Sequence, residues 1–154
     1  MIKNGIRRLM LSESGFTLIE MLLVLSILLI IMATTIVAVP RYLEKREIES
    51  FLQQLSHDVH YAQALAIQDQ SFYRVTLNTS SDIYFISKYT KRVFTREFPE
   101  GVSFMRGNST MDSSVTAYAS GIFSDSGTWI FKTEHYTYAF KIYLGEGRHT
   151  YHEQ

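Results

Sequence analysis

The sequence predicts an α+β protein in which one long N-terminal helix packs on a small antiparallel β-sheet. Three observations predict this class. Residues 21–39 form an uncharged apolar run, residues 40–70 follow an amphipathic helical pattern, and residues 71–154 alternate with the period of strands. Most of the aromatic side chains lie after Gln70, so the strand-rich part is able to build a core despite its small size.

The composition excludes several classes of protein. The chain has 154 residues, which suits one ordinary domain. Its 15 Lys and Arg residues balance 15 Asp and Glu residues, which argues against a strongly basic nucleic-acid module and against an acidic disordered chain. The sequence has no cysteine, which excludes disulfides, cysteine-based zinc sites and thiol catalysis.

The first element is an apolar helix over residues 16–39, in which Glu20 is the only charged residue. At a rise of about 1.5 Å per residue it extends about 36 Å, compared with roughly 30 Å for the hydrocarbon core of a bilayer. We therefore expect a transmembrane helix. Three basic residues precede the run and three follow it closely, so the charges alone do not orient the chain.

An amphipathic helix over residues 40–70 comes next. Its apolar positions recur at spacings of four and three, as one face of a helix requires, and they are Ile48, Leu52, Leu55, Val59, Ala62 and Ala66. Pro40 stands between the two helical segments, and we expect it to kink or interrupt the helix there. The apolar face is predicted to pack on the sheet.

The remaining residues, 71–154, are predicted to form the antiparallel β part, so that residues 40–154 make one globular unit. Strands are expected at 72–77, 83–87, 102–105, 129–132, 136–144 and 148–152. The alternation is less clear between residues 89 and 98. The polar stretch 106–114 is predicted to be a loop, and residues 145–147 a tight hairpin turn.

Glu20 requires a chemical explanation, because an acid inside a bilayer costs about 2.5–3.5 kcal/mol on insertion scales and is usually paired with a cation. The apolar run offers no cation of its own. A cut after Gly15 would create one, the α-amine of Phe16, one helical turn before Glu20. In an assembly, the amine of a neighbouring chain would serve equally well.

The stretch Gly-Phe-Thr-Leu-Ile-Glu at residues 15–20, behind a short basic leader and before about 20 apolar residues, resembles the class III signal of type IV pilins and pseudopilins. The resemblance implies a pilin-like fold and a leader of residues 1–15. It also implies that a membrane-embedded prepilin peptidase cuts between Gly15 and Phe16 on the cytoplasmic face and methylates the Phe16 amine. Subunits then leave the membrane and pack their apolar helices into a filament, where an N-terminal amine neutralises Glu20.

The C-terminal hairpin Ile142-Tyr-Leu-Gly-Glu-Gly-Arg148 resembles the end of H-type pseudopilins of type II secretion systems, and still more the ComGD-type pseudopilins of Gram-positive competence operons. This resemblance implies a minor pseudopilin of a competence pseudopilus needed for DNA uptake. Its partners would be other pseudopilins and, indirectly, an assembly ATPase, with the C-terminal part outside the cell membrane. The alternatives are a subunit of a type II secretion or type IV pilus system, or a DNA-binding tip subunit. Pro40 departs from the pattern, since pilins often carry a helix-bending proline nearer the glutamate.

Four basic residues lie among aromatic residues and are candidates for contact with DNA. They are Lys88, Lys91, Arg92 and Arg96. The alternative is a solvated strand face over a core, which we favour because the chain as a whole is not basic.

No pattern in the sequence indicates an enzyme or a cofactor. The chain has no GxSxG, HExxH or phosphate-loop motif. His57 and His60 lie one helical turn apart, but no third metal ligand accompanies them, and His149 and His152 do not suggest a site. We therefore expect a structural protein that binds no metal.

Overall fold

The structure is a computed structural model that describes residues 15–107, 111–145 and 147–154, without the side chains of residues 34–38. Almost all of the leader expected at residues 1–15 lies outside this part. By its internal contacts the chain divides into two units, with the boundary between Val39 and Pro40. The two units are therefore described separately.

Helix α1 (Leu18–Gln68) includes Pro40, and the helical backbone continues through this residue. The helix is therefore not interrupted at Pro40, and the kink expected there as the alternative stays a prediction. A proline inside a helix removes one backbone hydrogen bond, and the long helical stretches on both sides keep the backbone helical despite this loss.

In the unit that ends at Val39, the large apolar side chains that the structure describes are exposed on the single chain, for example Leu18 at 78% and Leu22 at 51%. Among the residues that the structure describes, no helix combines the length and the apolar composition needed for a membrane crossing. The transmembrane helix over residues 16–39 stays a prediction.

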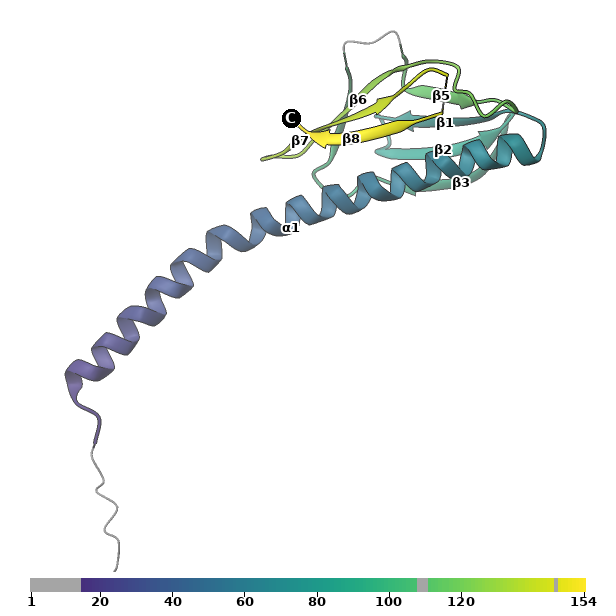
Figure 1. Ribbon diagram of the computed structural model, residues 1–154. Helices are drawn as coiled ribbons and strands as arrows, with labels where there is room; N and C mark the ends of the chain where they lie inside the picture. The colour runs from purple at the N-terminus through teal and green to yellow at the C-terminus, as the bar shows by residue number, and fades with distance from the viewer. Residues whose placement is uncertain (1–14, 108–110, 146) are drawn as a thin grey trace, which may run out of the picture. The chain divides into compact units, whose positions relative to one another are not determined.

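The second unit contains two antiparallel sheets of four strands each (Figure 1). The first sheet has the order β3-β2-β1-β5, formed by β3 (Lys91–Glu97), β2 (Ile83–Lys88), β1 (Tyr73–Asn78) and β5 (Ser114–Ala117). The second has the order β4-β6-β7-β8, formed by β4 (Ser103–Arg106), β6 (Gly127–Lys132), β7 (Thr137–Ile142) and β8 (His149–Glu153). The single sheet expected from the sequence is thus divided in two.

The sequence pattern left β3 in a stretch of unclear alternation and missed strand β5 entirely. Strand β5 has only four residues and directly follows a polar stretch, so it gives little alternation to detect. Its pairing with β1, in which Val75 faces Val115 and Tyr73 faces Ala117, completes the first sheet. A short strand of this kind is fixed by its neighbour rather than by its own propensity.

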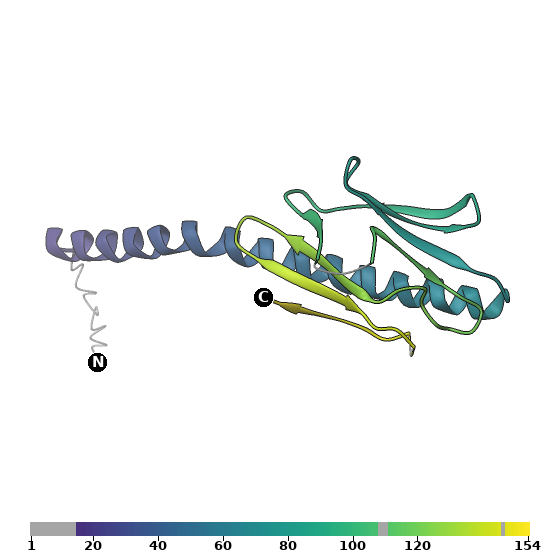
Figure 2. The same ribbon diagram turned by 90° about the horizontal axis from the view of Figure 1, so that it is seen from above.

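Both sheets lie along the part of α1 that belongs to this unit (Figure 2). The predicted apolar face of the helix is buried, with Ile48, Leu52, Leu55 and Val59 each at 0% exposure. Phe51 joins the two sheets, because its ring makes edge-to-face contacts with Tyr84 of β2 at 5.9 Å and with Phe131 of β6 at 5.4 Å. Such pairs add about 0.5–1.5 kcal/mol each beyond the burial of apolar area.

Candidate functional site

The predicted cleavage junction lies just outside the helix. The backbone N–H groups of Glu20 and Met21 donate to the carbonyl of Thr17 at 3.1 and 3.2 Å, and the N–H of Glu20 also donates to the Thr17 hydroxyl at 3.3 Å. Thr17 is therefore the N-cap residue of α1. The peptide bond between Gly15 and Phe16 precedes this cap, and Phe16 is 74% exposed.

The described part of the chain gives no packing reason for a glycine at position 15. A Cβ atom added there would meet none of the described atoms within 4 Å. Gly147 is the opposite case. It has a φ of 63°, and a Cβ there would lie 2.7 Å from the carbonyl oxygen of Gly121 and clash with Gln63. The folded chain thus explains Gly147 and leaves Gly15 to be explained by something outside it.

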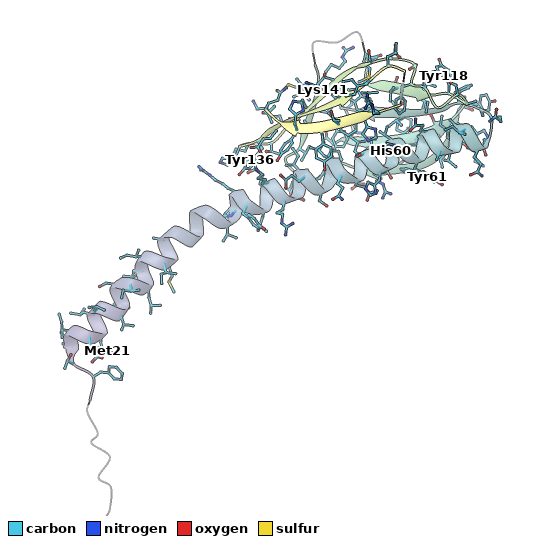
Figure 3. The ribbon with its side chains drawn as sticks, viewed as in Figure 1. Met21, His60, Tyr61, Tyr118, Tyr136 and Lys141 are labelled. Carbon is cyan, nitrogen blue, oxygen red and sulfur yellow. The ribbon has the colours of Figure 1, made fainter. Side chains whose placement is uncertain are left out.

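Glu20 lies in the first turn of α1 and is exposed. Negative charge is favourable at a helix N-terminus, because the unpaired N–H groups there carry partial positive charge. No residue in the described part of the chain forms an ion pair with its carboxylate. Its location among exposed apolar side chains (Met21 marks this turn in Figure 3) leaves the carboxylate available to a cation from another source.

The four basic residues proposed for DNA contact do not form one cluster. The Lys88 ammonium lies 2.6 Å from a carboxylate oxygen of Asp69, directly after α1, and holds the pKa of that carboxyl below its usual value. At the other end of β3, the Arg96 Nε lies 2.5 Å from a carboxylate oxygen of Asp58. Two of the four are therefore already paired with carboxylates of the same unit.

Lys91 and Arg92 remain at the start of β3. The Arg92 guanidinium lies 4.2 Å from the ring centroid of Phe85, a cation–π contact at the surface. Neither side chain has a carboxylate partner among the described residues. Together with Lys88 they line one surface hollow, from which Arg96 is absent.

Asp58 is the centre of a buried polar network that the sequence did not reveal. Its side chain is 7% exposed, and it accepts hydrogen bonds from the Tyr84 hydroxyl at 2.6 Å and from Gln54 Nε2 at 3.0 Å, as well as from Arg96. Burial, followed by the bond to Asp58, raises the pKa of Tyr84 above its usual range. The network holds α1 to β2 and β3, which gives Arg96 a structural role.

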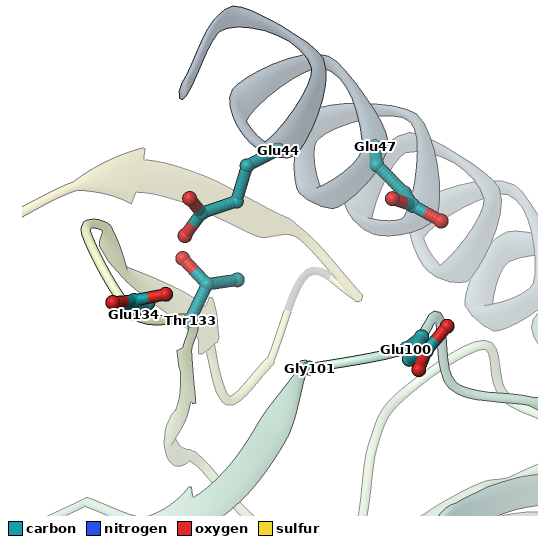
Figure 4. Close-up of a pocket in the computed structure, with 6 residues that line it drawn as sticks. All are labelled: Glu44, Glu47, Glu100, Gly101, Thr133 and Glu134. Atoms are coloured by element: carbon teal, nitrogen blue, oxygen red, sulfur yellow. The ribbon is translucent and has the colours of Figure 1, made fainter. Parts of the chain in front are cut away.

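A hollow lined mainly by glutamates lies near the start of this unit (Figure 4). Its volume is about 340 Å³, and its lining residues are Glu44, Glu47, Glu100, Gly101, Thr133 and Glu134. Glu44 accepts hydrogen bonds from the backbone N–H of His135 at 3.0 Å and lies 2.7 Å from His135 Nδ1. Hydrogen bonds from the Thr133 side chain and the His135 backbone hold the pKa of Glu44 at about 2.

The structure brings together a different pair of histidines from the pair that the sequence spacing suggests. His60 packs against His149 of β8, with ring centroids 4.2 Å apart, rather than acting with His57. His149 Nε2 lies 2.6 Å from the Ser56 hydroxyl, and its buried Nδ1 has no partner within the described structure. Within the described ranges, no group of three or more potential ligands is able to hold a metal ion.

Comparison with known proteins adds two findings. Residues 10–36 match the family model of the prokaryotic N-terminal methylation motif. The fold is similar to that of the type IV minor pilin FimU of Pseudomonas aeruginosa, with a TM-score of 0.58 and 14% identity over 71% of this chain and 90% of that one.

The fold is also similar to that of the minor pseudopilin EpsH from the type 2 secretion system of Vibrio cholerae, with a TM-score of 0.55 and 10% identity over 70% of this chain and 97% of that one. No protein with a curated description matches the sequence. The long helix packed on antiparallel sheets is the pilin and pseudopilin fold, and the chain carries on it a prokaryotic N-terminal methylation motif.

Proposed function

We propose that this chain is a minor pseudopilin, cut between Gly15 and Phe16 by a prepilin peptidase, methylated on the Phe16 amine and assembled with other pseudopilins through its apolar N-terminal helix. The observation that carries the proposal is the methylation motif at the start of a pilin-like fold. In this role the protein acts by packing and not by catalysis. We further propose that residues 16–39 anchor it in the cell membrane, with residues 40–154 outside.

Two local features support the cleavage step. The Gly15–Phe16 bond lies before the N-cap of α1, so a peptidase is able to bind it in an extended conformation without unwinding a helix. The fold itself does not require Gly15, which leaves the specificity of the peptidase as the reason for a small residue there.

The direct test is mass spectrometry of the protein purified from cells with and without the prepilin peptidase. We expect a chain that begins with N-methylated Phe16 when the enzyme is present and a chain that retains residues 1–15 when it is absent. An unprocessed N-terminus in both strains would reject the proposal.

We propose further that the assembly is a competence pseudopilus needed for DNA uptake. The support is the resemblance of the hairpin at residues 142–148 to ComGD-type pseudopilins. The test is deletion of the gene, complementation in trans and measurement of transformation by added DNA. Normal transformation after deletion would reject the competence role and favour a type II secretion or type IV pilus system.

A DNA-binding tip subunit is the second candidate. Lys88, Lys91 and Arg92 share one hollow, and the neighbouring Tyr89 is 65% exposed and offers a stacking surface. The full chain in detergent should then bind DNA, with an affinity that falls as salt rises. Absence of binding at low salt would remove this candidate.

A further inference from the structure

Aromatic and aliphatic side chains gather at the end of the unit 40–154 where α1 stops. They come from the last turns of α1, the residue before β1, the β2–β3 turn and the turn after β5. We call this surface the Tyr89 patch, and its residues are Ile67, Phe72, Tyr89, Tyr118 and Ile122. Tyr89 is 65% exposed, Tyr118 47% and Ile67 46%, so the patch is open to solvent on the single chain. Figure 3 marks this end of the unit by Tyr118.

The aromatic members of the patch are neighbours in the fold. The rings of Phe72 and Tyr89 meet edge-to-face, with centroids 4.8 Å apart. Phe72 and Tyr118 directly adjoin Tyr73 and Ala117, which are paired across β1 and β5. Phe72 therefore lies between the two exposed tyrosines.

The aliphatic members are held next to Tyr118 by the turn that follows β5. The N–H of Tyr118 donates to the carbonyl of Ile122 at 3.0 Å and closes this turn. The turn lies against α1, because Gln63 Nε2 donates to the carbonyl of Gly121 at 2.6 Å. A Cβ atom at Gly121 would be only 3.2 Å from Ile67 Cδ1. Ile67, Tyr118 and Ile122 thus belong to one continuous surface.

Tyr89 is unfavourable for the hairpin that carries it. It is the first of the two residues between β2 and β3, and its φ of 54° lies in the left-handed region. Glycine, asparagine and aspartate are the residues that such turn positions favour, and a bulky side chain there is strained. The local backbone therefore does not account for a tyrosine at this position, which leaves an interaction outside the chain as the reason for it.

The charges around the patch are mainly positive. The charged residues near it are the cations Arg74, Lys88, Lys91 and Arg92 and the anions Asp69 and Asp125. Lys88 lies 2.6 Å from Asp69, so these two charges offset each other. Lys91 and Arg92 are exposed, and no carboxylate within the described ranges pairs with either of them. The cations outnumber the anions, so an anionic partner surface is favoured.

This composition suits a protein partner better than a nucleic acid. Ile67 and Ile122 offer no ring on which a base stacks, and Lys91 and Arg92 are too few to neutralise many phosphates. Exposed tyrosine beside aliphatic side chains, with arginine at the rim, is typical of a protein interface. Electrostatic complementarity then calls for an apolar contact surface ringed by carboxylates.

We propose that the Tyr89 patch is the docking surface for a different subunit of the same assembly, whose contact surface is apolar and ringed by carboxylates. This inference rests on the proposed assembly into a pseudopilus and adds a contact outside the apolar N-terminal helix. A minor subunit enters an assembly in few copies, so a different subunit is the expected occupant rather than a second copy of this chain. The apolar side chains supply the buried area, and Lys91 and Arg92 guide the association.

Photo-cross-linking of the full-length protein in cells that assemble it tests the contact. The photo-reactive amino acid p-benzoylphenylalanine replaces Tyr118 in one strain and Ile122 in another. We expect both strains to give the same product, which mass spectrometry identifies as this chain joined to another protein with an N-terminal methylation motif, through a peptide that contains Asp or Glu. The control carries p-benzoylphenylalanine in place of Tyr151, which is 37% exposed on β8, and should not give this product.

Tyr89→Asn separates docking from folding. Asparagine is favoured at positive φ, so the melting temperature should not fall. The yield of the product from position 118 should fall about tenfold, because the variant removes the most exposed aromatic ring of the patch. A lower melting temperature with an unchanged yield would show that Tyr89 serves the fold and would overturn the inference.

Charge reversal tests the rim. Lys91→Glu with Arg92→Glu should lower the yield of the product about fivefold. Lys132→Glu with Arg46→Glu makes the same change in net charge at exposed positions outside the patch and should leave the yield unchanged. Equal yields from the two double variants would contradict the carboxylate-ringed partner.

The other occupants are distinct outcomes. Dimers of this chain alone, the same product from the control position, or a partner without the methylation motif would each overturn the inference. DNA binding by the full chain in detergent that Tyr89→Asn abolishes, with no protein product in cells, would also overturn it and favour the DNA-binding tip subunit.

Failure of this inference is distinguishable from failure of the proposed function, because the same gel reports removal of the leader. Processed protein without a cross-linked product would overturn the docking surface and leave the cleavage proposal standing. Unprocessed protein would reject the proposed function.

Discussion

Residues 16–33 and residues 48–66 are both rich in apolar side chains, but only the second segment buries them within the chain. Leu52 and Leu55 are at 0% exposure, whereas Leu18 and Leu23 are at 78% and 57%. A continuous exposed apolar surface of this kind normally has a partner. The fold therefore accounts for the apolar residues of the second segment, and we propose that lipid or neighbouring subunits account for those of the first.

The largest expected effect comes from Gly15→Leu. A leucine side chain fits the fold, since no atom lies within 4 Å of a Cβ at this position, so the thermal unfolding of the protein should not change. Leader removal should be abolished, because the proposed peptidase needs a small residue before the cut. Mass spectrometry and a melting curve measure the two properties on the same sample.

Gly147→Leu is the matched control for that experiment. It should lower the melting temperature, because of the close contacts with Gln63 and Gly121 and the positive φ, and should leave the N-terminal cut unaffected. Normal leader removal in Gly15→Leu, or equal melting temperatures in the two variants, would contradict the different roles that we assign to Gly15 and Gly147.

Glu20→Ala should leave cleavage intact and reduce assembly strongly. The variant removes the carboxylate that we propose pairs with an N-terminal amine, while the N-cap at Thr17 remains. Recovery of sheared pseudopilus fractions measures assembly. Glu97→Ala, an exposed glutamate of β3 in the other unit, serves as the control for loss of one acidic residue. Wild-type assembly of Glu20→Ala would contradict the amine–carboxylate pairing.

Asp58→Ala should destabilise the globular unit by about 2–3 kcal/mol, because it leaves Arg96 and the buried Tyr84 hydroxyl without their acceptor. Denaturant unfolding of the full chain in detergent measures the change. Asp112→Ala, which removes an exposed pair with Arg106, should cost less than about 1 kcal/mol. Equal losses of unfolding free energy in the two variants would show that the burial of Asp58 does not make its ion pair more important than the exposed one.

The helices and strands that could be predicted from the sequence are those in which apolar residues recur with a fixed period. The helical face from Ile48 to Ala66 and most strands were found correctly, because alternating exposure imposes a period on the residue types. Strand β5 and the division into two sheets were not found, since both depend on pairing between distant segments. The interruption considered at Pro40 rests on the low helix propensity of proline, which the helical segments on both sides outweigh.

The candidate sites show the same difference. A site within one short segment is visible in the sequence, and a site built from distant segments is not. The junction at Gly15 and Phe16 is a local motif and is visible in the sequence. The Asp58 network and the hollow lined mainly by glutamates combine residues from α1 with residues of the strands and turns. No spacing in the sequence therefore indicates them. Lys88 and Arg96 were grouped with Lys91 and Arg92 because they are close in sequence, whereas their ion pairs with Asp69 and Asp58 are visible only in the fold.

The smallest effect concerns pH and tests how tightly β8 is held to α1. Burial, followed by the neighbouring His60, lowers the pKa of His149 from 6.5 to about 4. The unfolded chain therefore binds a proton at higher pH than the folded one, and this histidine should lower stability as pH falls from about 6.5 to about 4. Glu44, with its pKa held at about 2, should lower stability only below about pH 4.5.

His149→Gln keeps a polar side chain beside Ser56 and removes the titrating group. Its unfolding free energy should be flatter than that of the wild type between about pH 6.5 and 4 and should fall with the same slope below that range. Urea unfolding at a series of pH values measures both slopes. Equal slopes above pH 4 in the two proteins would mean that His149 is solvated in solution and that β8 does not stay packed on α1 at this point.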